Sequence, residues 1–176
     1  MNDKKLSIMR WEVHPWWCPE EWQGLLAGQD CPMCSDGHLE NNQHSILIAR
    51  MRRSYFRLLR NQSVVGACVI ILERHANELF ELNAVELCEF WGDVAEAALA
   101  IHTVCSAVKI NYCILGNMIP HIHCHLIPRY YGDDLAKPIK LGEHESIIEA
   151  SELIHLVQRL RGNLQSGIGG HQKSGG

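Results

Sequence analysis

Residues 121–130, HIHCHLIPRY, alternate histidine with apolar side chains over three successive repeats. Strict alternation matches the two-residue period of a β-strand, in which successive side chains point to opposite faces of a sheet. His121, His123 and His125 would then share one face, about 6.6 Å apart along the strand, while the intervening apolar residues pack on the other. The pattern therefore requires a sheet with one buried face, and three neighbouring imidazoles suit a site for a metal ion, an anion, or both.

Apolar periodicity predicts further strands and three helices around this strand. The predicted strands are 45–51, 54–60, a doubly buried 64–72 and 109–115, and the predicted helices are 19–28, 83–107 and 143–160. In the longest helix Asn83 and Glu86 have the spacing of a capping box. The residues at helical spacing that would face the sheet are Leu87, Phe90, Trp91, Val94, Ala98 and Ile101. The apolar face of the helix predicted at 143–160 would consist of Ile147, Ile148, Leu153, Ile154 and Val157. Strands, a long helix and more strands indicate an α+β fold: a mostly antiparallel sheet of about five strands, covered by the long helix, with a C-terminal helix.

Length and composition favour one soluble domain. We expect a single domain over 1–165, which includes an aromatic-rich arm at 1–30, and a flexible Gly/Ser-rich tail at 166–176. A net charge of −4 gives no support to nucleic-acid coating. No apolar run reaches the ~18 residues of a membrane span, and the N-terminus lacks a signal-peptide core. We therefore expect a cytoplasmic protein without a membrane or nucleic-acid partner.

The chain has eight cysteines, which in a reducing compartment are expected to be thiols. Five lie within apolar patterns and are expected to be small buried side chains, namely Cys68, Cys88, Cys105, Cys113 and Cys124, and Cys18 is expected to be similar. Cys31 and Cys34 differ, because a two-residue gap lets both thiolates bind one zinc ion. An unoccupied pair of reduced thiols is the alternative.

The histidine strand resembles the signature of the histidine-triad nucleotide hydrolases and transferases, carried here by His121-Ile122-His123-Cys124-His125-Leu126-Ile127. The resemblance extends to RNQSVVGACVIILERHANELFEL and to KINYCILGNMIPHIHCHLIPRYYGDD, and covers roughly residues 31–135. The second segment looks like the bacterial branch often described as diadenosine-tetraphosphate-hydrolase-like. The resemblance implies a histidine-triad (HIT)-like fold, a nucleotide substrate and a homodimer whose sheets join edge to edge.

The resemblance also implies a reaction. Its middle histidine, His123, would attack the α-phosphorus of a dinucleoside polyphosphate or related conjugate and form a covalent nucleotidyl-histidine. His125 would contact the phosphate oxygens and assist proton movement. The implied nucleotide contacts are Asn61 at the ribose and Asn111, Gly116 and Asn117 at the phosphates. Met118 departs from the family, because many members carry serine or threonine at that position.

In zinc-bearing members of the superfamily, the positions of His75 and His121 complete the metal site with the two cysteines. A closed Cys2His2 site leaves no open coordination position, so the implied zinc is structural. Two alternatives remain open: a zinc-binding strand edge without any reaction, and a zinc-stabilised nucleotide-binding or interaction module without significant turnover.

Arginines on the first predicted hairpin have two interpretations. They either attract polyphosphate, since arginine binds phosphate oxygens in pairs, or form a solvated or partner-binding face. The residues are Arg50, Arg52, Arg53, Arg57 and Arg60. Arg129, at the end of the histidine strand, is expected to be an ion-pair partner.

Overall fold

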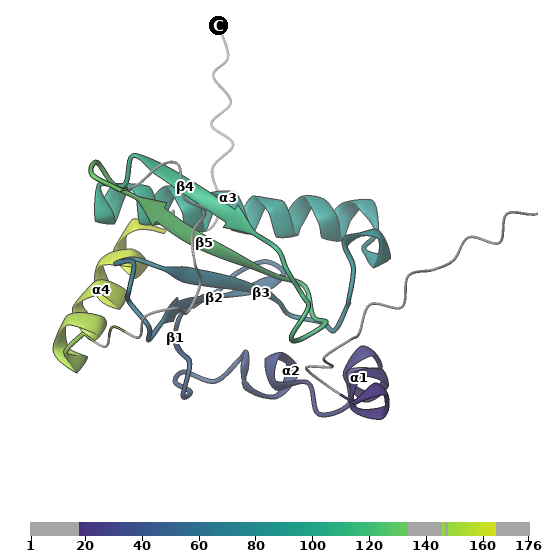
Figure 1. The fold of residues 1–176 in the computed structure, drawn as a ribbon. Coiled ribbons are helices and arrows are strands. Elements are labelled where there is room, and N and C mark those ends of the chain that lie inside the picture. Colours follow the sequence, from purple (N-terminus) through teal and green to yellow (C-terminus); the bar gives the residue numbers. More distant parts are fainter. Residues whose placement is uncertain (1–17, 134–145, 147, 165–176) are drawn as a thin grey trace, which may run out of the picture.

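A computed structural model describes residues 18–133, 146 and 148–164 of the chain (Figure 1). Five strands form one antiparallel sheet in the order β1-β2-β3-β5-β4. The strands are β1 Ser45–Arg50, β2 Ser54–Leu59, β3 Cys68–Leu72, β4 Lys109–Cys113 and β5 His123–Arg129. The helices are α1 Pro19–Leu26, α2 Pro32–Asp36, α3 Ala84–Cys105 and α4 Ala150–Asn163, with a 3-10 turn at Leu79–Glu81. The α+β class and the five-stranded antiparallel sheet are confirmed.

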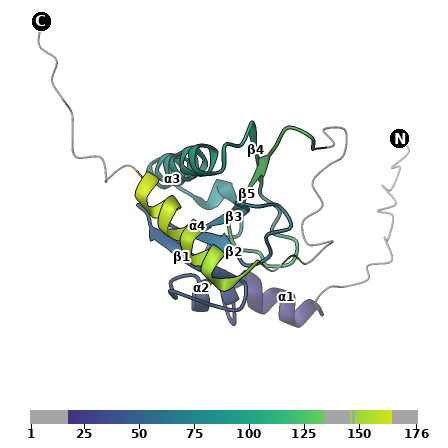
Figure 2. The same cartoon turned by 90° about the vertical axis from the view of Figure 1, so that its left-hand side faces the viewer.

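Helix α3 covers one face of the sheet, whereas α1 and α2 lie on the other side, and α4 flanks β1 (Figures 1 and 2). The capping box of α3 is confirmed: Asn83 Oδ1 accepts from the backbone N–H groups of Val85 and Glu86, both at 3.0 Å, and Glu86 Oε2 accepts from Asn83 N–H. None of the helices in the described ranges is long and apolar enough to cross a membrane.

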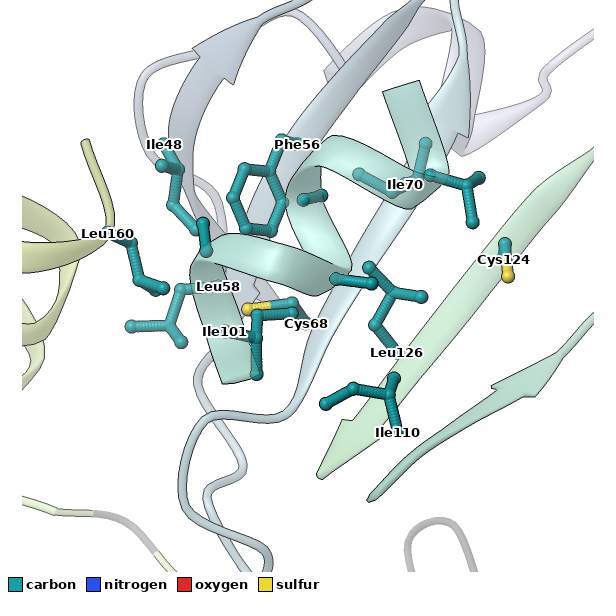
Figure 3. Packing of buried hydrophobic residues seen from close by; sticks show 14 of the residues in the cluster. Ile48, Phe56, Leu58, Cys68, Ile70, Ile101, Ile110, Cys124, Leu126 and Leu160 are labelled. Atoms are coloured by element: carbon teal, nitrogen blue, oxygen red, sulfur yellow. The ribbon is translucent and has the colours of Figure 1, made fainter. Parts of the chain in front are cut away.

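The core fills the space between α3, α4 and the sheet (Figure 3). Phe90, Val94, Ala98 and Ile101 of α3 are buried there as predicted. Trp91 is not, because each helical residue turns by about 100° and the position after Phe90 points away from the sheet. From β5, Cys124 and Leu126 enter this core, together with Ile122 just before the strand. The histidine side chains between them therefore belong to the opposite face.

Several element boundaries differ from the predictions. β3 begins only at Cys68, because the segment before it is a turn in which Gly66 adopts φ +85°. β4 ends at Cys113, and the short helix α2 directly after Cys31 was not predicted. α4 runs from Ala150 to Asn163, and Ile154 is exposed on it instead of buried. The predicted stretches 134–145, Ile147 and the tail lie outside the described residues, as do residues 1–17 of the predicted arm.

Two cysteine expectations are wrong. Cys18 and Cys88 are exposed, Cys88 because it lies on the outer surface of α3. Cys68 and Cys124 are buried as expected, and Cys105 and Cys113 are half-buried.

Candidate active site and metal centre

His123 and His125 lie side by side on the sheet face that is remote from α3. β5 sits between β3 and β4: His125 is paired with Val69 of β3 and with Cys113 of β4, whereas His123 is paired with Ile71 of β3. Their ring centroids are 5.1 Å apart at an interplanar angle of 81°. His121 precedes β5, and its ring contacts the cysteine pair instead. The three histidines therefore divide into a neighbouring pair and a separate third ring.

The tautomer of His123 follows from its hydrogen bond. His123 Nδ1 lies 2.6 Å from the backbone carbonyl oxygen of His121. A carbonyl oxygen only accepts, so Nδ1 carries the proton and Nε2 keeps its lone pair. His123 is only 6% exposed, and this burial lowers the pKa of its ring. The hydrogen bond to the His121 carbonyl acts in the opposite direction and raises the pKa. The site therefore holds a neutral imidazole with a defined free nitrogen.

His125 is also neutral, and part of its ring has no partner. Burial lowers its pKa to about 4, and neighbouring His123 adds to the effect. Within the described residues its Nδ1 is buried without a hydrogen-bond partner. Buried polar atoms are nearly always bonded, so this nitrogen marks a position for a ligand or water atom.

Cys31, Cys34, His75 and His121 form a cluster whose four candidate ligand atoms lie within 4.8 Å of one another. His121 Nδ1 is 3.5 Å from the Sγ atoms of both cysteines, and His75 Nδ1 is 3.4 Å from Cys34 Sγ. In a tetrahedral zinc site, bonds of about 2.3 Å to sulfur and about 2.0 Å to nitrogen separate these atoms by about 3.6 Å. The donor set and its spacing fit zinc.

Backbone carbonyls orient both histidines of this cluster. His121 Nε2 donates to the carbonyl oxygen of Leu72 at 2.8 Å, and His75 Nε2 donates to that of Leu26 at 3.2 Å. Each bond holds the proton on Nε2 and leaves Nδ1 free to bind a metal. Because these acceptors are main-chain atoms, their side-chain identities give no sequence signal.

The predicted phosphate-binding residues lie beside β5. Asn111 of β4 is paired with Ile127 of β5, and its Oδ1 accepts from Arg129 Nη1 at 3.3 Å. Gly116, at φ +79°, lies in the loop that joins β4 to β5, and Asn117 is exposed in the same loop. The register thus places Asn111 on the same sheet face as His125 and on the neighbouring strand.

Asn61, the predicted ribose contact, lies just after β2. Its Oδ1 accepts from the backbone N–H groups of Ser63 at 3.0 Å and Ser146 at 3.2 Å. A ribose hydroxyl donating to the same oxygen would have to compete with both.

A cavity of about 480 Å³ adjoins Gly116 at this end of the sheet. Its walls include Trp22 of α1, Phe80, Pro120 and Asn77. Asn77 Nδ2 donates to the Leu26 carbonyl, whereas its Oδ1 is buried without a partner in the described part of the chain.

The arginines of the first hairpin have partners within the protein. Arg57 is fully buried, so the prediction that it lies on a phosphate-attracting or solvated face is wrong: it donates to the Gly37 carbonyl at 2.7 Å and to Ser45 Oγ at 2.8 Å. The other guanidinium groups contact acidic or amide groups: Arg50 with Glu73, Arg52 with Asp93 and Glu96, Arg53 with Glu89, and Arg60 with Asn41.

Comparisons with known proteins identify the architecture. A curated relative, an uncharacterized HIT-like protein from Methanocaldococcus jannaschii, is 27% identical over 86 residues, which are 47% of this chain and 65% of the relative. The chain thus aligns with less than two thirds of that relative's length. The crystal structure of a histidine triad protein from Bradyrhizobium japonicum superposes with a TM-score of 0.63 at 20% identity, covering 73% of this chain and 96% of that one.

A zinc-bound histidine triad family protein from Mycobacterium smegmatis is also similar in fold, with a TM-score of 0.55 and 18% identity, covering 77% of this chain and 93% of that one. At such identities these structures show a shared fold. The model of the HIT domain family matches residues 40–132, more than half of the chain and including all five strands. The chain belongs to the HIT domain family.

Proposed function

We propose that the protein is a nucleotide hydrolase or nucleotidyl transferase that acts on the α-phosphate of a dinucleoside polyphosphate or a related nucleotide conjugate. The HIT fold is a nucleotide-binding and hydrolase fold. The observation that carries the proposal is the state of His123, which combines a neutral ring with an unprotonated Nε2 on the sheet face of His125.

In the first step His123 Nε2 attacks the α-phosphorus, and a P–N bond forms as the P–O bond to the leaving phosphate or nucleotide breaks. The ring becomes cationic in the intermediate. Its Nδ1–H bond to the His121 carbonyl then becomes charge-assisted, which stabilises the covalent state. In the second step water, or inorganic phosphate in a phosphorylase variant, displaces the histidine and restores neutral His123.

The neighbouring polar groups would bind the substrate in this reaction. His125 contacts the phosphoryl oxygens and assists proton movement, and Asn111, Gly116 and Asn117 line the phosphate site. Asn61 holds the ribose. Support for this arrangement comes from the position of Asn111 on the strand next to His125 and from the unpartnered His125 Nδ1.

A structural zinc ion would be held by Cys31, Cys34, His75 and His121. It would tie the segment that contains α1 and α2 to the ends of β3 and β5, and would supply no step of the reaction. The ligand-atom spacing supports this assignment. A cytoplasmic location is consistent with it, since the site needs reduced thiols.

A homodimer joined through β4 is part of the proposal. β4 is an edge strand, and an unpaired edge invites pairing with a second chain. Exposed apolar side chains lie on this strand and along α3, namely Tyr112, Trp91 and Leu99. An edge-to-edge dimer would cover both features.

A nucleotide-binding module without significant turnover is the second candidate. The low exposure of His123 favours it, because a phosphorus atom must reach Nε2 for attack. The two candidates are separated by incubating the protein with diadenosine tetraphosphate and with an AMP-amide. We expect product release that His123→Ala abolishes and that the exposed-site control His102→Ala retains. Turnover that survives His123→Ala refutes the assigned nucleophile, and no turnover by the unmodified protein favours the module.

A further inference from the structure

Arg129 connects the end of the histidine strand to the predicted phosphate site. Its Nε donates to Asp133 Oδ2 at 2.7 Å, and its Nη1 donates to Asn111 Oδ1 at 3.3 Å. Asp133 is itself held in place, since its Oδ2 also accepts from the Tyr130 backbone N–H at 3.0 Å, and these bonds lower the pKa of its carboxyl. The Arg129 side chain is 12% exposed. Arg129 Nε is thus held by Asp133, and Arg129 Nη1 is directed at Asn111.

The contact with Arg129 determines which way the Asn111 amide points. Arginine has donors and no acceptor, so only the oxygen of the amide can face it. The amide nitrogen, with two N–H donors, must then point elsewhere. Along β5, Arg129 is paired with Lys109 on one side of Asn111, whereas His125 is paired with Cys113 on the other. With the oxygen turned towards Arg129, Nδ2 is the amide donor that faces away from it.

We propose that Arg129, anchored by Asp133, is a positioning residue that orients the Asn111 amide so that Nδ2 donates to the phosphate at the His123–His125 site. This inference rests on the proposed function. Without Arg129 the amide can turn over and present its oxygen to a negatively charged phosphate, which replaces attraction by repulsion. Arg129 itself does not touch the substrate.

A double-mutant cycle tests the route through Asn111. We expect Arg129→Met to lower kcat/KM for diadenosine tetraphosphate by about tenfold, the loss of one hydrogen bond to a charged group. In an Asn111→Ala background the same change should cost less than about twofold, because the group it orients is gone. Arg53→Met is the matched control: it removes an arginine–carboxylate pair with Glu89 of α3, on the other side of the sheet, and should leave kcat/KM unchanged. An equal loss in both backgrounds, or no loss in either, overturns the proposal.

A second measurement does not depend on turnover. The side-chain amide protons of Asn111, assigned by their disappearance in Asn111→Asp, should shift in NMR spectra when Arg129 is changed to Met and when saturating AMP is added to the unmodified protein. Asp133→Ala removes the anchor and should produce the same displacement if Arg129→Met does not fold. Absence of turnover with these shifts intact contradicts the proposed reaction and leaves the orientation standing. Unchanged amide signals in Arg129→Met or Asp133→Ala refute the orientation itself.

Discussion

Loss of the metal cluster should release the N-terminal segment before it disturbs the sheet. The cluster joins Cys34 to His75 across 41 positions and Cys31 to His121 across 90. Both α1 and α2 lie on the opposite side of the sheet from α3 and its core, so they depend on this link more than the strands do (Figure 1). His75→Ala removes one ligand and is the perturbation of choice, because His75 is not part of β3 or β5.

The size of the effect follows from ligand linkage. An ion that binds only the folded chain stabilises it by about 4 kcal/mol when its free concentration is about 1,000 times its dissociation constant. For a chain of this length that corresponds to a fall of about 8–16 °C in Tm on complete loss of the ion. His75→Ala should show most of this fall in zinc-buffered solution. His102→Ala, an exposed histidine on α3, should show none.

Three assays together decide this prediction. Metal analysis should find near one zinc per chain, falling sharply in His75→Ala. Thermal denaturation in buffered zinc should give the Tm difference. Hydrogen exchange should show faster exchange in α1 and α2 after chelation, with α3 unchanged. Equal Tm values for His75→Ala and His102→Ala, or α1 protection that survives chelation, would refute the structural role of the cluster.

Other perturbations test separate parts of the structure. Asp93 has a fully buried carboxylate that accepts hydrogen bonds from Arg52 Nη1, from the backbone N–H groups of Arg52 and Arg53, and from Ser54 Oγ. Asp93→Ala should therefore lower the free energy of unfolding by about 3 kcal/mol in urea denaturation. A loss below about 1 kcal/mol contradicts a structural role for this carboxylate. His125 has a pKa of about 4, below the ordinary 6.5, so the unfolded chain binds its proton first and stability should fall as pH drops from about 6.5 to about 4. This loss of stability on acidification should be smaller in His125→Asn. Identical profiles of stability against pH for the variant and the unmodified protein would contradict the low pKa of His125. Trp91→Glu should convert the proposed dimer to monomer in sedimentation, and a dimer that persists in this variant contradicts an interface that includes Trp91.

Residue patterns predicted the histidine strand and the long helix because each pattern depends only on residues that are close together in the sequence. Alternation at 121–127 predicted a strand with His123 and His125 on one face, but the prediction that His121 belongs to the same strand is wrong, since β5 begins at His123. Asn83 with Glu86 predicted the start of α3. Burial on one face of a helix is harder to predict at its margins, which is why Trp91 and Ile154 were assigned wrongly. Gly66 broke an apolar run that otherwise looked like one long strand.

Contacts between residues that are far apart in the sequence could not be predicted from residue patterns alone. Arg57 looked like a surface cation, yet it binds main-chain oxygens of a loop some 20 positions earlier. The partners of Arg129 and the carbonyls that orient His75 and His121 likewise depend on how distant segments meet. The metal cluster was predicted through a family resemblance, and the structure brings its four residues together.

The nucleophilic role of His123 is tested most directly by trapping the intermediate. The protein is mixed with diadenosine tetraphosphate, quenched within milliseconds under alkaline denaturing conditions that preserve phosphorus–nitrogen bonds, and digested for peptide mass spectrometry. We predict one nucleotidyl group attached to the peptide containing residues 121–129, located at His123 by fragmentation and absent in His123→Ala. Product formation with no adduct under conditions that preserve such bonds, or an adduct on His121 or His125, would contradict the account.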